Sequence, residues 1–139
     1  MALNLRTEIL LSATPDAVWA VLTDFASYPD WNLFLTHASG DWSVGNTVAI
    51  TAGGMSFKPV VLAYETGKEL RWRGNLLLDT LFVGEHYFLL EERTPGKTLL
   101  THGEDFRGVL LPILRSKLVK DTKAGFEAMN EALAARLTA

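Results

Sequence analysis

The stretch that decides the fold class is PILRSKLVKDTKAGFEAMNEALAARL, residues 112–137. Its apolar and small side chains recur in steps of three and four, the spacing of one stripe along a helix. The members of this stripe are Leu114, Leu118, Thr122, Phe126, Met129, Leu133 and Leu137. Pro112 stands at the start, where a helix accepts proline. The pattern predicts one long helix over 112–137, about 39 Å in length, with a single face turned to the core.

Upstream of this helix the pattern changes to strands separated by turn residues. The clearest turns are Gly45-Asn46, Gly53-Gly54, Thr66-Gly67-Lys68 and Pro95-Gly96-Lys97. Between them we predict strands at 36–42, 47–52, 57–64, 69–78, 83–92 and 97–106.

The N-terminal part supplies one further strand and two short helices. Residues 3–11 alternate between apolar and polar side chains, which predicts a half-buried strand. Thr14 and Pro15 suit the N-cap and first position of a helix that ends near Asp24, and 25–31 reads as a second helical turn. The chain is thus predicted to be α+β, a single domain over 1–139 with a seven-stranded antiparallel sheet and helices on one face.

Composition narrows the classes of partner. The net charge of −3 and the pI near 5.6 disfavour nucleic acid as a partner. The absence of cysteine excludes disulfides and thiolate zinc sites. No apolar run approaches the ~20 residues that span a bilayer, and residues 1–11 lack the apolar core of a signal peptide. We therefore expect a cytoplasmic protein that does not insert into membranes.

Local motifs resemble a known family. They are ATPDAVW (13–19), LTDF (22–25), YPDWN (28–32), LRWRG (70–74), GEHYF (84–88), TLLT (98–101) and EDFRG (104–108). With the order of elements, they are similar to the bacterial polyketide cyclase/dehydrase-like branch of the START and pollen-allergen superfamily, also called SRPBCC. The resemblance implies a helix-grip fold, in which a curved antiparallel sheet wraps around the long C-terminal helix. It also implies a cavity between sheet and helix, in a branch that includes lipid carriers and cyclases.

Strand alternation places one polar constellation on the inner face of the sheet. His86 is inward on one predicted strand, and His102 and Glu104 are inward on its predicted neighbour. Three interpretations stay open: mutual hydrogen bonding in a partly polar interior, a ligand-recognition or acid–base site, and a metal site of two histidines and a carboxylate. No local motif supports a metal, so we predict neither a metal nor another cofactor.

The predicted cavity is lined by aromatic and aliphatic residues, which is typical of ligand pockets. The expected lining residues are Trp31, Phe34, Trp72, Phe88, Phe106, Leu114, Leu118, Phe126 and Met129, together with His86, His102 and Glu104. We expect a carrier or sensor of a small hydrophobic, aromatic or lipid-like molecule rather than an enzyme. The alternative is a polyketide cyclase or dehydratase with His86, His102 and Glu104 as catalytic residues. A third reading is an interaction module, with the protein a monomer or weak homodimer.

Gly125 is an irregularity inside the long helix. Glycine at such a position costs about 1 kcal/mol relative to alanine. A close packing contact, room for a ligand and chance are the three explanations that the sequence leaves open.

Overall fold

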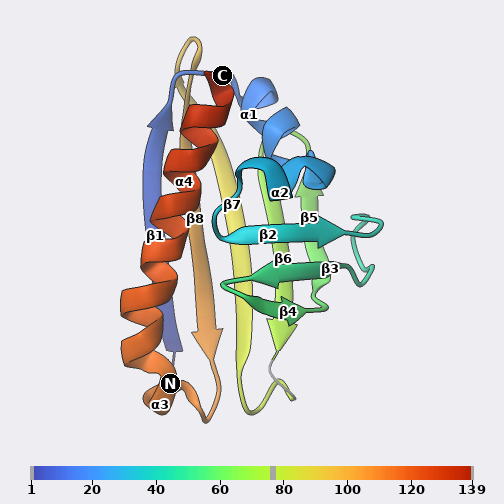
Figure 1. Ribbon diagram of the computed structural model, residues 1–139, viewed down its shortest axis with the longest axis vertical. Coiled ribbons are helices and arrows are strands. Elements are labelled where there is room, and N and C mark those ends of the chain that lie inside the picture. The colour runs from blue at the N-terminus through green and yellow to red at the C-terminus, as the bar shows by residue number, and fades with distance from the viewer. Residues whose placement is uncertain (1, 76–77, 139) are drawn as a thin grey trace.

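A five-stranded antiparallel sheet forms one layer of the protein in a computed structural model, which describes residues 2–75 and 78–138. Its strands, in spatial order, are β1 (Ala2–Leu11), β8 (Lys97–Arg107), β7 (Val83–Thr94), β6 (Glu69–Asn75) and β5 (Val60–Glu65). A second, three-stranded sheet consists of β2 (Leu35–Ser39), β3 (Ala49–Ala52) and β4 (Met55–Phe57). Its strands cross in front of one side of the larger sheet (Figure 1). The pairings within both sheets are antiparallel, as predicted.

The long C-terminal helix lies beside β1 and β8, on the same face of the larger sheet as β2–β4 (Figure 1). It consists of α3 (Leu111–Lys117), a π-helical segment (Leu118–Thr122) and α4 (Lys123–Leu137), which follow one another without a break. The predicted stripe is its inner face: Phe126, Met129 and Leu133 are buried, and the other members are half-buried. The α+β helix-grip fold is therefore confirmed. The π-helical segment has no counterpart in the sequence pattern.

The two short helices begin as predicted. The Thr14 side chain accepts a hydrogen bond from the Ala17 N–H at 3.2 Å, and Pro15 occupies the first turn of α1 (Pro15–Leu22). A 3₁₀ turn (Phe25–Ser27) and α2 (Tyr28–Trp31) follow. α1 ends two residues before the predicted Asp24.

The described strands number eight, not the seven predicted, because the expected strand 57–64 divides into β4 and β5 at Pro59. Proline has no N–H to donate to a ladder. The Pro59 carbonyl still accepts a hydrogen bond from Val48, and Val61 donates to the carbonyl of Asn46, both at 2.9 Å. These bonds tie the small sheet to the large one. The expected strand 36–42 also ends earlier, at Ser39, and residues 76–77 of the expected strand 69–78 lie outside the described residues.

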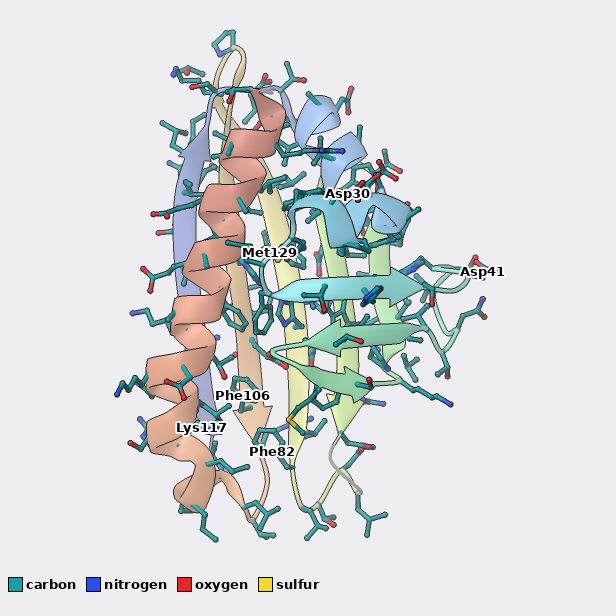
Figure 2. All side chains as sticks on the ribbon, viewed as in Figure 1. Asp30, Asp41, Phe82, Phe106, Lys117 and Met129 are labelled. Atoms are coloured by element: carbon teal, nitrogen blue, oxygen red, sulfur yellow. The ribbon has the colours of Figure 1, made fainter. Side chains whose placement is uncertain are left out.

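The hydrophobic core lies between the larger sheet and the layer made by the long helix and β2–β4. Figure 2 shows the side chains that fill this interior, with Met129 on the sheet-facing side of α4. Phe88 of β7, Leu100 of β8 and Phe126 of α4 are completely buried there. Within the described ranges, we find no helix that is both long and apolar enough to cross a bilayer.

Candidate functional site

The structure brings the three predicted polar residues together on the inner face of the sheet. His86 of β7 lies directly opposite Glu104 of β8, and His102 is two residues from Glu104 on the same face. His86 Nδ1 is 3.1 Å from Glu104 Oε1, and His86 Nε2 is 2.7 Å from His102 Nε2. Both imidazoles are buried, and the Glu104 side chain is 16% exposed. Glu104 is therefore the member of this group that reaches toward solvent.

Two residues that the sequence analysis missed extend this group. The His102 Nδ1 is 2.8 Å from the Asn130 side-chain oxygen on α4. The Asn130 amide donates to the Thr7 hydroxyl of β1 at 2.8 Å, and that hydroxyl donates to the His102 carbonyl at 2.7 Å. The five residues form what we call the buried polar chain: Glu104, His86, His102, Asn130 and Thr7. The sequence offered one signal for Asn130, which is that this polar residue directly follows Met129 of the apolar stripe.

The backbone carbonyl of His102 fixes the direction of the hydrogen bonds in the buried polar chain. A carbonyl can only accept, so the Thr7 hydroxyl donates to it and must accept from the Asn130 amide. The side-chain oxygen of Asn130 then faces His102 Nδ1, which must carry the hydrogen. The other nitrogen of a neutral His102 accepts, so His86 donates from Nε2 and presents an unprotonated Nδ1 to Glu104. The carboxyl group of Glu104 must supply the proton of that last contact.

The pKa values of the buried groups agree with this assignment. Burial lowers the pKa of His86 to about 3. Burial, and then the neighbouring His86, lower the pKa of His102 well below its usual range. Burial, with a smaller contribution from Asp105, raises the pKa of Glu104 to about 8. At neutral pH the two imidazoles are thus neutral and Glu104 mainly holds its proton.

Aromatic rings enclose the two histidines. Trp72 of β6 stacks on His86 with the ring centroids 4.7 Å apart and the planes 7° from parallel. His102 lies between Phe88 and Phe126, at centroid distances of 4.3 and 4.4 Å. These apolar neighbours exclude water, which is why the imidazoles remain uncharged.

Phe34 fills a notch between the small sheet and α4. A Cβ atom at Gly125 would lie 2.6 Å from the Phe34 ring, and one at Gly53 in the β3–β4 turn would lie 3.5 Å from it. The ring also lies edge-on to Phe126, with centroids 5.3 Å apart, and 6.3 Å from His86. The glycine inside the helix is therefore explained by close packing of this ring.

The position of the Glu104 carboxyl group requires a second glycine. A side chain at Gly84, the inward-facing residue before His86 on β7, would collide with the Glu104 carboxyl group. Phe106 lies against the same glycine and stacks on Phe82 with centroids 5.4 Å apart (Figure 2). Among the residues that the structure describes, no hydrogen bond reaches Glu104 Oε2.

The remaining predicted lining residues are less closely associated with the buried polar chain. Trp31 packs edge-on against Tyr28 in α2, with centroids 5.5 Å apart. Leu114 is only half-buried on α3, and Leu118 is half-buried against the core. Met129 is buried on α4 beside Asn130. The structure therefore concentrates the predicted set around His86, His102 and Phe126.

Two hollows on the part of the surface that the structure describes do not coincide with the predicted lining. One lies on the small sheet, bordered by His37, Ile50 and Phe57. The other lies between β1 and α4, where Thr7 and Asn130 form part of its wall. Aromatic side chains occupy the space beside His86, so a ligand there would need a side chain to move.

The geometry of the histidines does not suit a shared metal ion. Their Nε2 atoms face each other at 2.7 Å, whereas two nitrogens bound tetrahedrally to zinc are roughly 3.3 Å apart. Within residues 2–75 and 78–138, no group of three histidine, aspartate or glutamate side chains is arranged to hold a metal. That the protein works without a metal stays a prediction.

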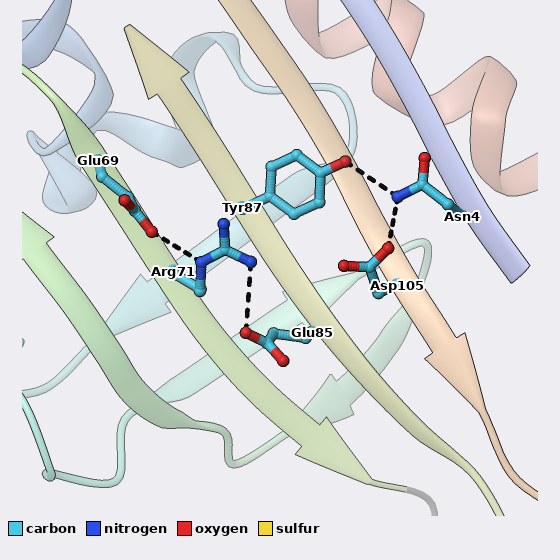
Figure 3. A network of polar contacts seen from close by, with 6 residues as sticks. All are labelled: Asn4, Glu69, Arg71, Glu85, Tyr87 and Asp105. Carbon is cyan, nitrogen blue, oxygen red and sulfur yellow. Dashed lines mark hydrogen bonds and ion pairs between the residues drawn. The ribbon is translucent and has the colours of Figure 1, made fainter. Parts of the chain in front are cut away.

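The outer face of the same strands carries a separate polar network (Figure 3). Arg71 pairs with Glu69 at 2.7 Å and Glu85 at 3.3 Å, and its guanidinium group lies 4.8 Å from the centre of the Tyr87 ring. The Tyr87 hydroxyl accepts from Asn4 at 3.1 Å. Arg71 is half-buried and paired with both carboxylates. Because these groups satisfy one another, we assign this network to the stability of the sheet.

Comparison with known proteins identifies the family. The family described as polyketide cyclase / dehydrase and lipid transport matches residues 2–138. The chain therefore belongs to this family, and the resemblance to the START and SRPBCC superfamily is confirmed. No curated protein matches the chain.

Solved structures agree with this membership. A protein of Mesorhizobium loti is 25% identical, with a TM-score of 0.74 over 98% of this chain and 96% of that one. A START superfamily protein of Mycobacterium smegmatis is 18% identical, with a TM-score of 0.75 over 97% of each chain. Norcoclaurine synthase of Thalictrum flavum, in complex with dopamine and hydroxybenzaldehyde, is 14% identical, with a TM-score of 0.74 over 99% of this chain and 87% of its own. The protein has the fold of the START and polyketide cyclase proteins.

Proposed function

We propose that the protein binds a small apolar ligand with a ring system between the larger sheet and α4, as a carrier or sensor. The observation that carries this proposal is the buried polar chain, which is enclosed by aromatic rings and ends in the partly exposed carboxyl group of Glu104. Apolar walls with a few placed polar groups are typical of sites that bind small molecules. Flat rings also suit stacking against Phe126.

Phe34 is the side chain that a ligand would replace. Its ring is wedged between Gly53 and Gly125 and faces His86, so its departure would leave a space against the imidazole. The backbone of this segment is held in place, because the Asn32 side chain accepts hydrogen bonds from the N–H groups of Phe34 and Leu35 at 3.0 and 2.8 Å. We therefore expect the ring, rather than the backbone, to move when a ligand enters.

The test is titration of tryptophan fluorescence with aromatic polyketides, quinones and fatty acids. Ring-containing ligands should bind, and Phe34→Ala should bind them several-fold more tightly because the space is already open. Leu33→Ala, next in sequence but 71% exposed, is the matched control and should behave as the wild type. If neither the wild type nor Phe34→Ala binds any of these compounds, the carrier proposal fails and an interaction module becomes the better explanation.

Acid–base catalysis on the same ligand is the second candidate. It is favoured by the raised pKa of Glu104, about 8, because a group that titrates near the working pH can both give and take a proton. Cyclisation or dehydration of a bound polyketide that stops in Glu104→Gln, while binding persists, would establish this function. Binding without turnover by the wild type would support the carrier function instead.

A further inference from the structure

The hydrogen-bond directions in the buried polar chain also specify what the ligand must carry. We infer that the ligand is a hydroxylated ring compound, a phenol or an enol, whose O–H donates to Glu104 Oε2. This inference rests on the proposed binding function and concerns the same site. It follows from the contacts of five residues: Thr7, His86, His102, Glu104 and Asn130.

The hydrogen bond at the Thr7 end of the buried polar chain determines where the proton lies on Glu104, at the other end. Because the His102 carbonyl must accept from Thr7, each following contact has only one possible direction, and His86 Nδ1 meets Glu104 without a hydrogen of its own. Glu104 therefore uses Oε1 to donate its proton, and Oε2 is left as a carbonyl oxygen. If the proton moves to His86 instead, Oε2 becomes a carboxylate oxygen. It is an acceptor in both cases, so its partner must be a donor.

The surroundings of Glu104 select a neutral donor. Phe106, stacked on Phe82, packs with the carboxyl group over Gly84, and a cationic group placed there would lose its hydration without a full counter-charge. An ammonium group is thus disfavoured, and a ketone or ether cannot donate. A hydroxyl group on a ring meets both conditions.

The experiment compares 2-naphthol with 2-methoxynaphthalene at pH 6.5, by calorimetric titration of the wild type and of Phe34→Ala. We expect 2-naphthol to bind about tenfold more tightly, which corresponds to roughly 1.4 kcal/mol. Equal binding, or tighter binding of the methyl ether, overturns the inference and leaves the binding proposal intact. Failure of both compounds to bind either protein overturns the binding proposal, and this inference with it.

Two substitutions of Glu104 test the direction of the hydrogen bonds in the buried polar chain. Glutamine copies the protonated carboxyl group, because its amide can donate to His86 Nδ1 while its oxygen takes the place of Oε2. Glu104→Gln should therefore keep the preference for 2-naphthol, whereas Glu104→Leu should abolish it. Glu85→Gln, one residue from His86 but on the outer face, is the control and should keep it.

A spectroscopic measurement tests directly which nitrogen of each histidine carries the hydrogen. Long-range ¹H–¹⁵N correlation spectra at pH 6.5 should show hydrogen on Nε2 of His86 and on Nδ1 of His102, in the wild type and in Glu104→Gln. Hydrogen on Nδ1 of His86 in Glu104→Gln, or loss of the 2-naphthol preference in that variant, would overturn the assignment.

Discussion

At the scale of single residues, Glu104 shows how burial converts a carboxyl group into a neutral hydrogen-bond donor. An exposed glutamate is ionised at pH 7, but here an unprotonated imidazole nitrogen lies 3.1 Å away and only 16% of the side chain is exposed. The carboxyl group thus stays protonated because ionisation would leave a charge with little hydration. The same environment makes its protonation a measurable part of the protein's stability.

The pH dependence of unfolding should reveal this group. The folded state keeps the Glu104 proton up to about pH 8, whereas the unfolded chain releases it near 4.5. The unfolded state therefore binds fewer protons over this interval, and the free energy of unfolding falls as pH rises, by at most about 1.4 kcal/mol per pH unit. We expect the Tm of the wild type to fall more between pH 5 and pH 8 than that of Glu104→Gln. Parallel Tm profiles for the two proteins would contradict the buried, protonated state.

At the scale of elements, the contact between the long helix and the segment before β2 is decided by one missing methyl group. Gly125 admits the Phe34 ring, whose Cδ1 would lie 2.6 Å from an added Cβ. The helix thus gives up the higher helix propensity of alanine in exchange for close packing.

A double-mutant cycle measures this exchange. Gly125→Ala should destabilise the wild type by about 1–3 kcal/mol through overpacking. In the Phe34→Ala background the same change should stabilise by up to about 1 kcal/mol, because only the propensity gain remains. Denaturant unfolding of the four proteins gives both values. An equal effect in both backgrounds would mean that the ring and the glycine are not coupled.

At the scale of the whole molecule, two layers share one core, so the buried face of the long helix supports the entire fold. Phe126 is completely buried between β7, β8 and Phe34. An unpaired carboxylate at that position costs several kcal/mol, comparable with the stability of a whole domain.

Phe126→Asp should therefore abolish the cooperative thermal transition seen by circular dichroism. Val119→Asp makes the same chemical change on the outer side of the helix, where the side chain is 44% exposed, and should melt close to the wild type. A Phe126→Asp protein that melts cooperatively at the wild-type temperature would contradict the packing of α4 against the sheet.

The sequence by itself determined the elements and the faces of this protein. Apolar periodicity predicted the helix over 112–137 and its buried stripe, and strand alternation placed His86, His102 and Glu104 on one face, because these patterns depend on neighbours a few residues apart. Only the tertiary structure showed that Thr7 and Asn130, 123 positions apart, complete the buried polar chain. It also decided the break at Pro59, the π-helical segment and the seating of Phe34 against Gly125. These features depend on contacts between distant segments, and the hydrogen-bond direction that sets the state of Glu104 originates in such a contact.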